Sequence, residues 1–259
     1  MNIIGIDIGG TKCAVVSATT SGEIKSRDEF DTRTDLGLDY TLGRLYEAIE
    51  GLLKVEPKSD DELIFGISCG GPLDSQKGLV MSPPNLPGWD DVPITQLLTE
   101  RFGGKAYLLN DANACALAEW HYGAGKGSNN VIFLTFGTGL GAGLILDGRL
   151  YTGANGLAGE VGHIRLAEDG PEGYGKAGSF EGFCSGGGIA KLGRQMVADA
   201  FAKGETVGFC PTEKEKQSLD AKAIAIAARD GDPLAKKIIA KSAFYLGRGL
   251  SILIDIRSE

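Results

Sequence analysis

The chain contains a short glycine turn whose residue types suit the binding of a polyphosphate. It reads DIGGTK from Asp7 to Lys12, directly after an apolar run. Gly9 and Gly10 let the backbone approach a ligand closely, and the successive N–H groups of Gly10, Thr11 and Lys12 can form an anion-binding nest. Asp7 is a candidate ligand for Mg²⁺ through water, because magnesium prefers oxygen ligands and keeps part of its hydration shell. A plain hairpin turn is the alternative interpretation.

A second turn of the same kind lies about 130 residues further on. It consists of Gly137, Thr138 and Gly139, again between two apolar runs. A second hydroxyl-bearing glycine turn would hold the same polyphosphate from the other side. Either turn alone is weak evidence, whereas two such turns facing one cleft would be strong evidence for a phosphate site.

The pair Asn110–Asp111 follows a predicted strand and precedes a predicted helix. A carboxylate in this place suits a general base, which would take the proton from an alcohol that attacks a γ-phosphate. Both residue types also favour the N-cap of a helix. The two roles are compatible, and the residues alone leave both open.

Carboxylates and an imidazole stand together at Glu160 and His163, with Glu181 further along the chain. Such groups offer several hydrogen-bond partners to a polyhydroxylated ligand, and a His–carboxylate group can instead bind a metal. A single histidine among glycines is more commonly structural. The other histidine, His121, lies on an alanine-rich predicted helix and is expected to be structural.

Hydrophobic periodicity predicts the elements that carry these residues. Strands are expected at 2–8 and 13–18, from 62 into a glycine-proline turn ending at 73, at 105–111, and on both sides of the turn at 137–139. A proline-rich loop covers 81–93. Helices are expected at 39–55, 94–103, 112–125, 188–202, 220–231 and 233–254.

The two strand–glycine turn–strand segments resemble each other and indicate two related α/β halves. We expect one domain over 1–111, ending at the candidate base, and a second over 112–259. Clefts between domains are common ligand sites, so we expect the two turns to face one cleft.

Composition narrows the function classes. The 259 residues include 40 glycines and carry a formal net charge of −8, without the basic footprint of a nucleic-acid-binding protein. The five cysteines form no CxxC pair and no secretory signal opens the chain, which predicts reduced thiols in the cytoplasm. No apolar run approaches the roughly 18 residues of a membrane span.

Taken together, these motifs resemble the ROK family (repressors, open reading frames and kinases) of the actin/hexokinase/Hsp70 superfamily. The resemblance runs from Asn2 to about Leu253, and the longest motif is highly specific. The matching stretches are DIGGTK at 7–12, GGPLDSQKGLVMSPPNLPGW at 70–89, LNDANACALAE at 109–119 and GTGLGAGLILDGRLYTGANGLAGEVGH at 137–163.

The resemblance implies two ribonuclease-H-like domains that close on a sugar and Mg-ATP, and transfer of the γ-phosphate to a hexose hydroxyl, usually the 6-hydroxyl. It makes Asp111 the catalytic base. The implied sugar-binding residues are Gly71, Asn85, Asn110, Asp111, Glu160, His163 and Glu181. The residues implied to face Mg²⁺ and the phosphates are Asp7, Gly9, Gly10, Thr11, Lys12, Gly137, Thr138 and Gly139.

One departure from the family concerns zinc. Many members carry a zinc site built from the histidine of the long motif and three cysteines in a CxCGxxGCxE pattern. Here the corresponding stretch is EGYGKAGSFE, in which Glu172, Tyr174 and Ser179 replace the cysteines and only Glu181 remains. We therefore expect no structural zinc, and another interaction must order this segment and orient His163.

Two further departures concern the ends of the chain. Family repressors carry an N-terminal helix-turn-helix domain, whereas here the first strand begins at residue 2, so we expect no nucleic-acid partner. The chain also stops after LGRGLSILIDI at 246–256, where the family continues into further strands and helices of the second domain that form much of the adenine site.

The resulting hypothesis is a cytoplasmic, ATP- and Mg²⁺-dependent hexose kinase with glucose as first substrate. Kinases for N-acetylmannosamine, fructose or allose are alternatives. A non-catalytic sugar-binding relative is the alternative of another class. Relatives are often dimers, so a homodimer is one possible state.

Overall fold

The computed structural model describes residues 2–55 and 62–257. Contacts within the chain divide it into two compact units. Unit 1 comprises Met1–Val131 and Ile145–Gly156, and unit 2 comprises Ile132–Leu144 and Leu157–Glu259. The helix after Asp111 packs on strands of the first sheet, so it clusters with unit 1, whereas the predicted boundary at 111/112 placed it in the second domain.

Unit 1 is built on a five-stranded mixed sheet. Its order is β3-β2-β1-β4-β7, in which β2 runs antiparallel to both neighbours and β1, β4 and β7 run parallel. The parallel strands are in register, so Ile8 pairs with Cys69 and Cys69 with Asn110. The strands are β1 (Asn2–Ile8), β2 (Lys12–Ala18), β3 (Ile24–Asp31), β4 (Leu63–Cys69) and β7 (Lys105–Asn110).

Three α-helices pack on this sheet. Helix α1 buries Leu42, Leu45, Ile49 and Leu52, which recur at helical spacing and form one face. The segment 81–93 has no regular structure, as expected, but it places Trp89 in the core with 1% of its surface exposed. The remaining elements of unit 1 are η1 (Thr34–Leu36), α1 (Gly37–Val55), β5 (Leu73–Asp74), β6 (Leu79–Val80), α2 (Ile94–Phe102) and α3 (Asp111–Tyr122).

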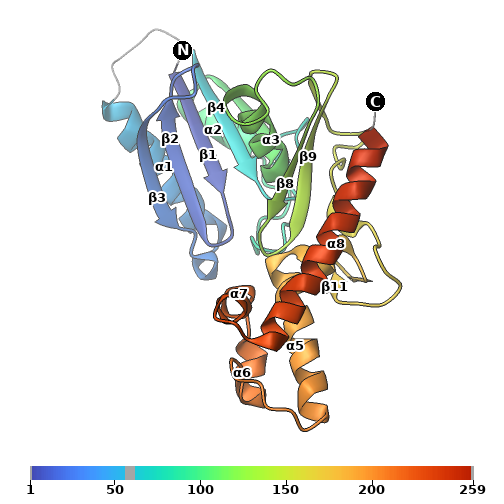
Figure 1. Cartoon of the computed structure of the whole chain (residues 1–259). Helices are drawn as coiled ribbons and strands as arrows, with labels where there is room; N and C mark the ends of the chain where they lie inside the picture. Colours follow the sequence, from blue (N-terminus) through green and yellow to red (C-terminus); the bar gives the residue numbers. More distant parts are fainter. Residues whose placement is uncertain (1, 56–61, 258–259) are drawn as a thin grey trace. The chain divides into compact units, whose positions relative to one another are not determined.

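Strands β8 (Val131–Phe136), β9 (Leu140–Leu146) and β10 (Arg149–Tyr151) form a second sheet in the order β10-β9-β8. Unit 2 contains most of β8 and β9 and is otherwise mainly helical. Its longest helix, α8, contacts α4 and, as labelled in Figure 1, α5 and α7. Its elements after β10 are η2 (Val161–His163), β11 (Glu172–Gly173), β12 (Lys176–Ala177), α4 (Phe180–Cys184), α5 (Gly186–Ala202), α6 (Glu213–Ser218), α7 (Ala221–Arg229) and α8 (Pro233–Arg257).

The structure confirms both predicted hairpins and all the predicted helices, with ends that differ by a few residues. It adds β3, α4 and α6, which the pattern of apolar residues did not reveal. Strand β3 reads IKSRDEFD and is polar because it is the edge strand of its sheet. Within the described ranges, no helix is both long and apolar enough to cross a membrane.

Candidate active site

The predicted phosphate, sugar and base residues of unit 1 gather at the carboxyl ends of its parallel strands. Gly9 and Gly10 follow β1, Gly70 and Gly71 follow β4, and Asn110 ends β7. Ligands of open α/β sheets commonly bind at this edge. The sheet therefore brings together segments that lie up to about 100 residues apart in the sequence.

The first glycine turn lies directly against Asn85. The N–H of Gly9 donates to the carbonyl oxygen of Lys12 at 3.1 Å, which closes the turn. A Cβ atom at Gly10 would lie 2.4 Å from the carbonyl oxygen of Asn85, so any larger residue would push the two segments apart. Among the residues that the structure describes, the N–H groups of Gly10 and Thr11 have no acceptor. The nest predicted from the residue types is thus available to an anion.

The amide side chains of Asn85 and Asn110 lie beside the next glycine pair. A Cβ at Gly70 would lie 3.7 Å from Nδ2 of Asn85, and a Cβ at Gly71 would lie 3.6 Å from Nδ2 of Asn110. The structure therefore brings three predicted sugar-binding residues, Gly71, Asn85 and Asn110, to the same edge as the turn after β1.

Lys12, which was predicted to face the phosphates, pairs with a carboxylate of the same sheet. Its Nζ donates to Oε1 of Glu29 at 2.7 Å, on the neighbouring strand β3. The hydrogen bond that the Lys12 ammonium donates to Glu29 raises the pKa of this ammonium, so the side chain stays charged. Its role toward a phosphate stays a prediction, which requires that the exposed pair with Glu29 open.

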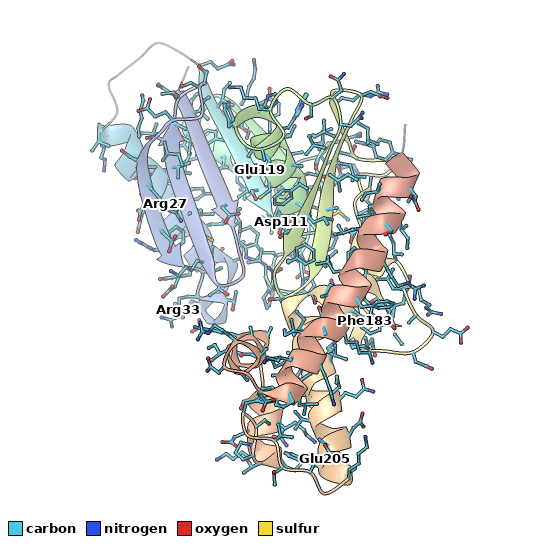
Figure 2. All side chains as sticks on the ribbon, in the orientation of Figure 1. Arg27, Arg33, Asp111, Glu119, Phe183 and Glu205 are labelled. Atoms are coloured by element: carbon cyan, nitrogen blue, oxygen red, sulfur yellow. The ribbon has the colours of Figure 1, made fainter. Side chains whose placement is uncertain are left out.

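Asp111 begins α3 at the point where β7 ends (Figure 2). Asn110 caps this helix, because its Oδ1 accepts from the N–H of Ala112 at 3.0 Å, and Oδ1 of Asp111 accepts from the same N–H at 2.8 Å. Burial raises the pKa of the Asp111 carboxyl, and the charge of Asp7 raises it further, while the hydrogen bond from Ala112 lowers it. The cap predicted from the residue types is confirmed, and the carboxylate still has an oxygen outside this bond.

In unit 2 the second glycine turn is supported by the beginning of α5. The N–H of Gly137 donates to the carbonyl oxygen of Gly139, and the N–H groups of Gly186 and Gly187 donate to the carbonyl oxygens of Gly137 and Thr138 at 2.8 and 3.1 Å. A Cβ at Gly186 or Gly187 would lie within 3 Å of these oxygens. The sequence reasoning did not assign these two glycines a role, although a triple glycine that opens a helix is itself a signal of close approach.

Glu181 braces the same turn. Its Oε2 accepts the N–H of Leu140 at 3.0 Å, and a Cβ at Gly139 would lie 2.8 Å from that oxygen. Glu181, a predicted sugar-binding residue, is thus hydrogen-bonded through one oxygen to the turn that is predicted to bind phosphate. Its contact with a sugar stays a prediction.

Glu160 and His163 are brought together as predicted. The Oε2 of Glu160 lies 3.6 Å from Nε2 of His163, beyond ordinary hydrogen-bond distance. Two residues that the sequence reasoning did not assign a role contact the histidine. The ring of Tyr174 stacks on the imidazole, and Nζ of Lys176 donates to the carbonyl oxygen of His163 at 2.9 Å.

Metal ligands are sparse in both groups of residues. Over the described ranges, no three or more His, Cys, Asp or Glu side chains lie close enough together to hold a metal ion. Asp7 offers one exposed carboxylate beside the first turn. One carboxylate suits a magnesium ion that is bound through water and is also coordinated by the phosphates of a substrate.

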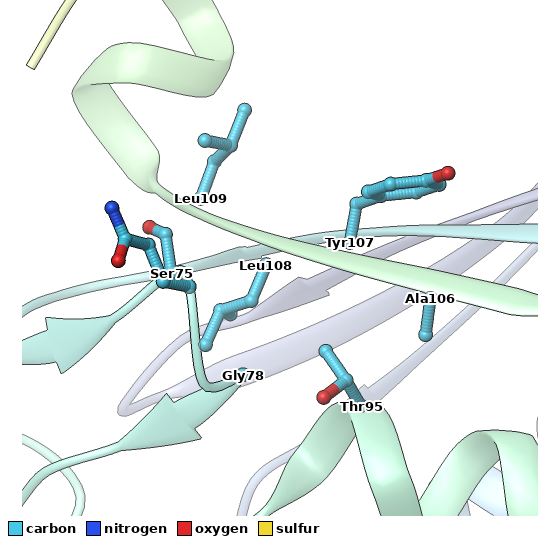
Figure 3. A pocket seen from close by; sticks show the side chains of 8 residues that line it. Ser75, Gly78, Thr95, Ala106, Tyr107, Leu108 and Leu109 are labelled. Atoms are coloured by element: carbon cyan, nitrogen blue, oxygen red, sulfur yellow. The ribbon is translucent and has the colours of Figure 1, made fainter.

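A cavity of about 530 Å³ lies in unit 1, at the free edge of β7 (Figure 3). It is lined by Ser75, Gly78, Thr95 and residues 106–109. None of the predicted site residues lines it, so it is distinct from the cluster at the carboxyl ends of the strands.

Fold and site together define a mixed α/β protein with two glycine turns and a carboxylate at a strand end. The model of the ROK family matches residues 3–258, and the chain belongs to this family. Glucokinase of Thermotoga maritima is 33% identical over 258 residues, which cover 99% of this chain and 78% of that protein. N-acetylmannosamine kinase of Escherichia coli O157:H7 is 33% identical over 100% of this chain and 79% of its own length. The xylose repressor of Caldicellulosiruptor bescii is 30% identical, over 98% of this chain and 63% of its own length.

Solved structures agree with this assignment. The ROK hexokinase of Thermus thermophilus superposes with a TM-score of 0.77 at 31% identity, over 99% of this chain and 78% of that one. A ROK glucokinase of Streptomyces griseus in complex with glucose and AMPPNP superposes with a TM-score of 0.74 at 32% identity. The match covers 99% of this chain and 80% of that one. This chain therefore has the mixed α/β fold of the ROK hexokinases.

Proposed function

We propose that this protein is an ATP-dependent hexose kinase that transfers the γ-phosphate to a sugar hydroxyl, with the 6-hydroxyl of glucose as the first candidate. The observation that carries the proposal is Asp111. Its carboxylate has a raised pKa and lies at the edge of the sheet where Gly10, Asn85 and Asn110 converge. A relative at 32% identity has been solved with glucose and AMPPNP, and glucokinases are among the similar proteins.

In this proposal the side chains of unit 1 prepare the hydroxyl. Asn85 and Asn110 hold sugar hydroxyls through their amides. Asp111 accepts the proton of the attacking hydroxyl while the hydroxyl oxygen bonds to the γ-phosphorus and the bond from that phosphorus to the β,γ-bridging oxygen breaks, which releases ADP. A raised pKa favours this role, because a general base works best when its pKa approaches the working pH. Phosphoryl transfer otherwise requires mainly positioning and neutralisation of charge.

The phosphates would meet backbone rather than side chains. The unpartnered N–H groups of Gly10 and Thr11 suit an anion. In unit 2, α5 directs its N-terminal, positive end at the turn of Gly137–Gly139. Mg²⁺, held through water by Asp7, would neutralise charge on the transferred phosphoryl group.

The sugar-facing residues of unit 2 would be Glu160, His163 and Glu181. Their carboxylates and imidazole offer donors and acceptors to hydroxyl groups. We propose that the residues of both units act on one bound sugar and one nucleotide.

A non-catalytic sugar-binding role is the second candidate, since a xylose repressor is 30% identical to this chain. The net charge of −8 disfavours a direct contact with DNA. A sugar-binding relative without catalysis has no need of a base with a raised pKa, so Asp111 favours the kinase.

A coupled ADP-release assay on the purified chain tests the proposal. Mg-ATP is supplied with each of glucose, N-acetylmannosamine, fructose and allose, and reactions without sugar serve as the control. Sugar-dependent ADP release by the wild type, lost in Asp111→Asn, is the expected result and identifies the substrate. Sugar binding measured by calorimetry, without ADP release and without binding of Mg-ATP, would instead support the non-catalytic role.

A further inference from the structure

The segment that carries zinc in many ROK proteins is held together here by other contacts. The four positions that match the zinc ligands are His163, Glu172, Tyr174 and Ser179, and none of the last three is a cysteine. Of the three replacements only Glu172 carries a group that zinc commonly binds, whereas structural zinc sites use four thiolates or imidazoles. In the part of the chain that the structure describes, no three His, Cys, Asp or Glu side chains lie close enough together to hold a metal ion. These four residues therefore do not fit a structural zinc site.

Each of the four positions has another partner. Ser179 caps α4, since its Oγ accepts the N–H of Gly182 at 3.0 Å, and it also lies 3.4 Å from the carbonyl oxygen of Gly173 as a donor. The carbonyl oxygen of Glu172 accepts from Nζ of Lys191 on α5 at 2.8 Å. These bonds attach strand β11 to α4 and α5.

The other two positions contact each other directly. The rings of His163 and Tyr174 stack with centroids 4.5 Å apart and an angle of 18° between their planes. Lys176, on the second strand of the same hairpin, donates to the carbonyl oxygen of His163 at 2.9 Å. The hairpin thus holds the histidine at both its ring and its backbone.

The backbone conformation of Tyr174 does not by itself favour a bulky residue. Tyr174 and Gly175 are the two central residues of the hairpin turn, with φ of 48° and 71°. Positive φ at both positions favours Asn-Gly in such turns, and a bulky residue is uncommon there. Tyr174 as a whole is 73% exposed, so burial does not account for a tyrosine at this position.

We propose that Tyr174 is a positioning residue, which orients His163 toward the sugar in place of a zinc ion. The imidazole edge then faces Glu160, whose carboxylate lies 3.6 Å from Nε2, and the pair is presented to sugar hydroxyls. This inference rests on the proposed hexose kinase activity for its effect on the sugar, whereas the metal-free stack itself does not depend on that activity.

Two variants test the role of the ring. Tyr174→Asn removes the stack and suits the turn, while Tyr174→Phe keeps the stack and serves as the matched control. We expect Tyr174→Asn to raise the KM for hexose by about three- to tenfold, with the KM for ATP unchanged and the Tm unchanged or higher. Tyr174→Phe should restore the hexose KM of the wild type. An unchanged hexose KM in active Tyr174→Asn would overturn the proposal.

An NMR measurement does not require activity. The chain has only two histidines, so the His163 ring protons can be assigned with a His121→Gln variant. The Tyr174 ring should shift the His163 signals upfield, and the shift should disappear in Tyr174→Asn and persist in Tyr174→Phe. Signals that do not differ between wild type and Tyr174→Asn would overturn the proposal, even if no sugar proves to be a substrate.

A chelation experiment tests the absence of a zinc role. The purified protein is treated with EDTA or 1,10-phenanthroline, and its zinc content and Tm are measured before and after. Unchanged Tm, with zinc well below one per chain throughout, is the expected result. Stoichiometric zinc whose removal lowers the Tm would overturn the proposal. Absence of kinase activity in the wild type and in every variant would contradict the proposed function. The NMR and chelation results would still test whether Tyr174 stacks on His163 without zinc.

Discussion

Replacing Asp111 by Asn should remove catalysis and slightly stabilise the fold. Asp111→Asn keeps the shape of the side chain but cannot accept the proton of a hydroxyl. General-base catalysis typically contributes about 10²- to 10⁴-fold, so we expect kcat to fall by that factor with little change in the KM for hexose. The ADP-release assay measures both.

The stability change follows from the raised pKa of Asp111 in the folded protein. At neutral pH folding must keep the ionised carboxylate in a place that disfavours its charge, because of burial first and of Asp7 second. One pKa unit corresponds to about 1.4 kcal/mol. Part of the Asp111 residue still reaches solvent, however, and screening by water reduces the effect. We expect Asp111→Asn to gain from a few tenths to about 1 kcal/mol at pH 7.

The stability difference between Asp111→Asn and the wild type should depend on pH. Below the unfolded pKa of about 4 the carboxyl is protonated in both states, so the wild type has no penalty and the variant no advantage. The advantage should appear as the pH rises through the folded pKa and then stay constant. For the same reason, the acidic limb of kcat/KM in the wild type should lie above the ordinary pKa of aspartate.

Asp74→Asn in the same unit is the matched control with the opposite sign. Hydrogen bonds lower the pKa of Asp74, chiefly from the N–H of Lys77 and also from its ammonium group. Asp74→Asn should therefore lose stability at neutral pH, the loss should fade as the pH falls through the lowered folded pKa, and activity should remain. Turnover of Asp111→Asn within about twofold of the wild type, or a loss of stability at pH 7, would refute this reasoning.

The remaining predictions concern glycines and thiols. In α8, a Cβ at Gly249 would lie 2.5 Å from a buried phenylalanine ring, so Gly249→Ala should lower the free energy of unfolding by about 1–3 kcal/mol. Nothing lies within 4 Å of a Cβ at Gly247, so Gly247→Ala should raise it by about 0.5–1 kcal/mol; equal effects in urea unfolding would contradict this. Gly10→Ala would bring its Cβ to 2.4 Å from the carbonyl oxygen of Asn85, and we expect turnover to fall by about tenfold or more with the far-UV circular dichroism retained; full turnover would place this turn outside the site. Of the five described cysteines Cys115 alone is exposed, so one thiol per chain should react with an aromatic disulfide in the native state, more slowly than a free thiol because burial raises its pKa; two or more reacting thiols would contradict the burial of the others.

The local elements could be predicted because they depend on neighbours in the sequence. Apolar positions at helical spacing predicted α1, and α3 begins at the Asn110 cap that its residue types favour. The polar edge strand β3 escaped prediction, because an edge strand has no need of an apolar pattern on both faces. The buried Trp89 escaped because a proline-rich loop gives no sign of which side chains enter a core.

The candidate site was predictable in its residue types and only partly in its contacts. The motifs indicated Asp111, Asn85 and the glycine turns. Lys12, in contrast, pairs with Glu29 on the next strand, and Glu181 ties one oxygen to the N–H of Leu140. Glu29 and Leu140 are distant in the sequence from the residues that they contact, so no local pattern predicts these two hydrogen bonds.

By itself, the sequence determined the family, the two glycine turns, the position of the candidate base and the replacement of the zinc ligands, because these depend on which residues stand at which spacing. Only the tertiary structure decided how Asp111 ionises, since its pKa depends on burial and on the nearby charge of Asp7. It alone showed that the ring of Tyr174 stacks on His163, because this contact joins the turn between β11 and β12 to η2, and folding must bring the two segments together.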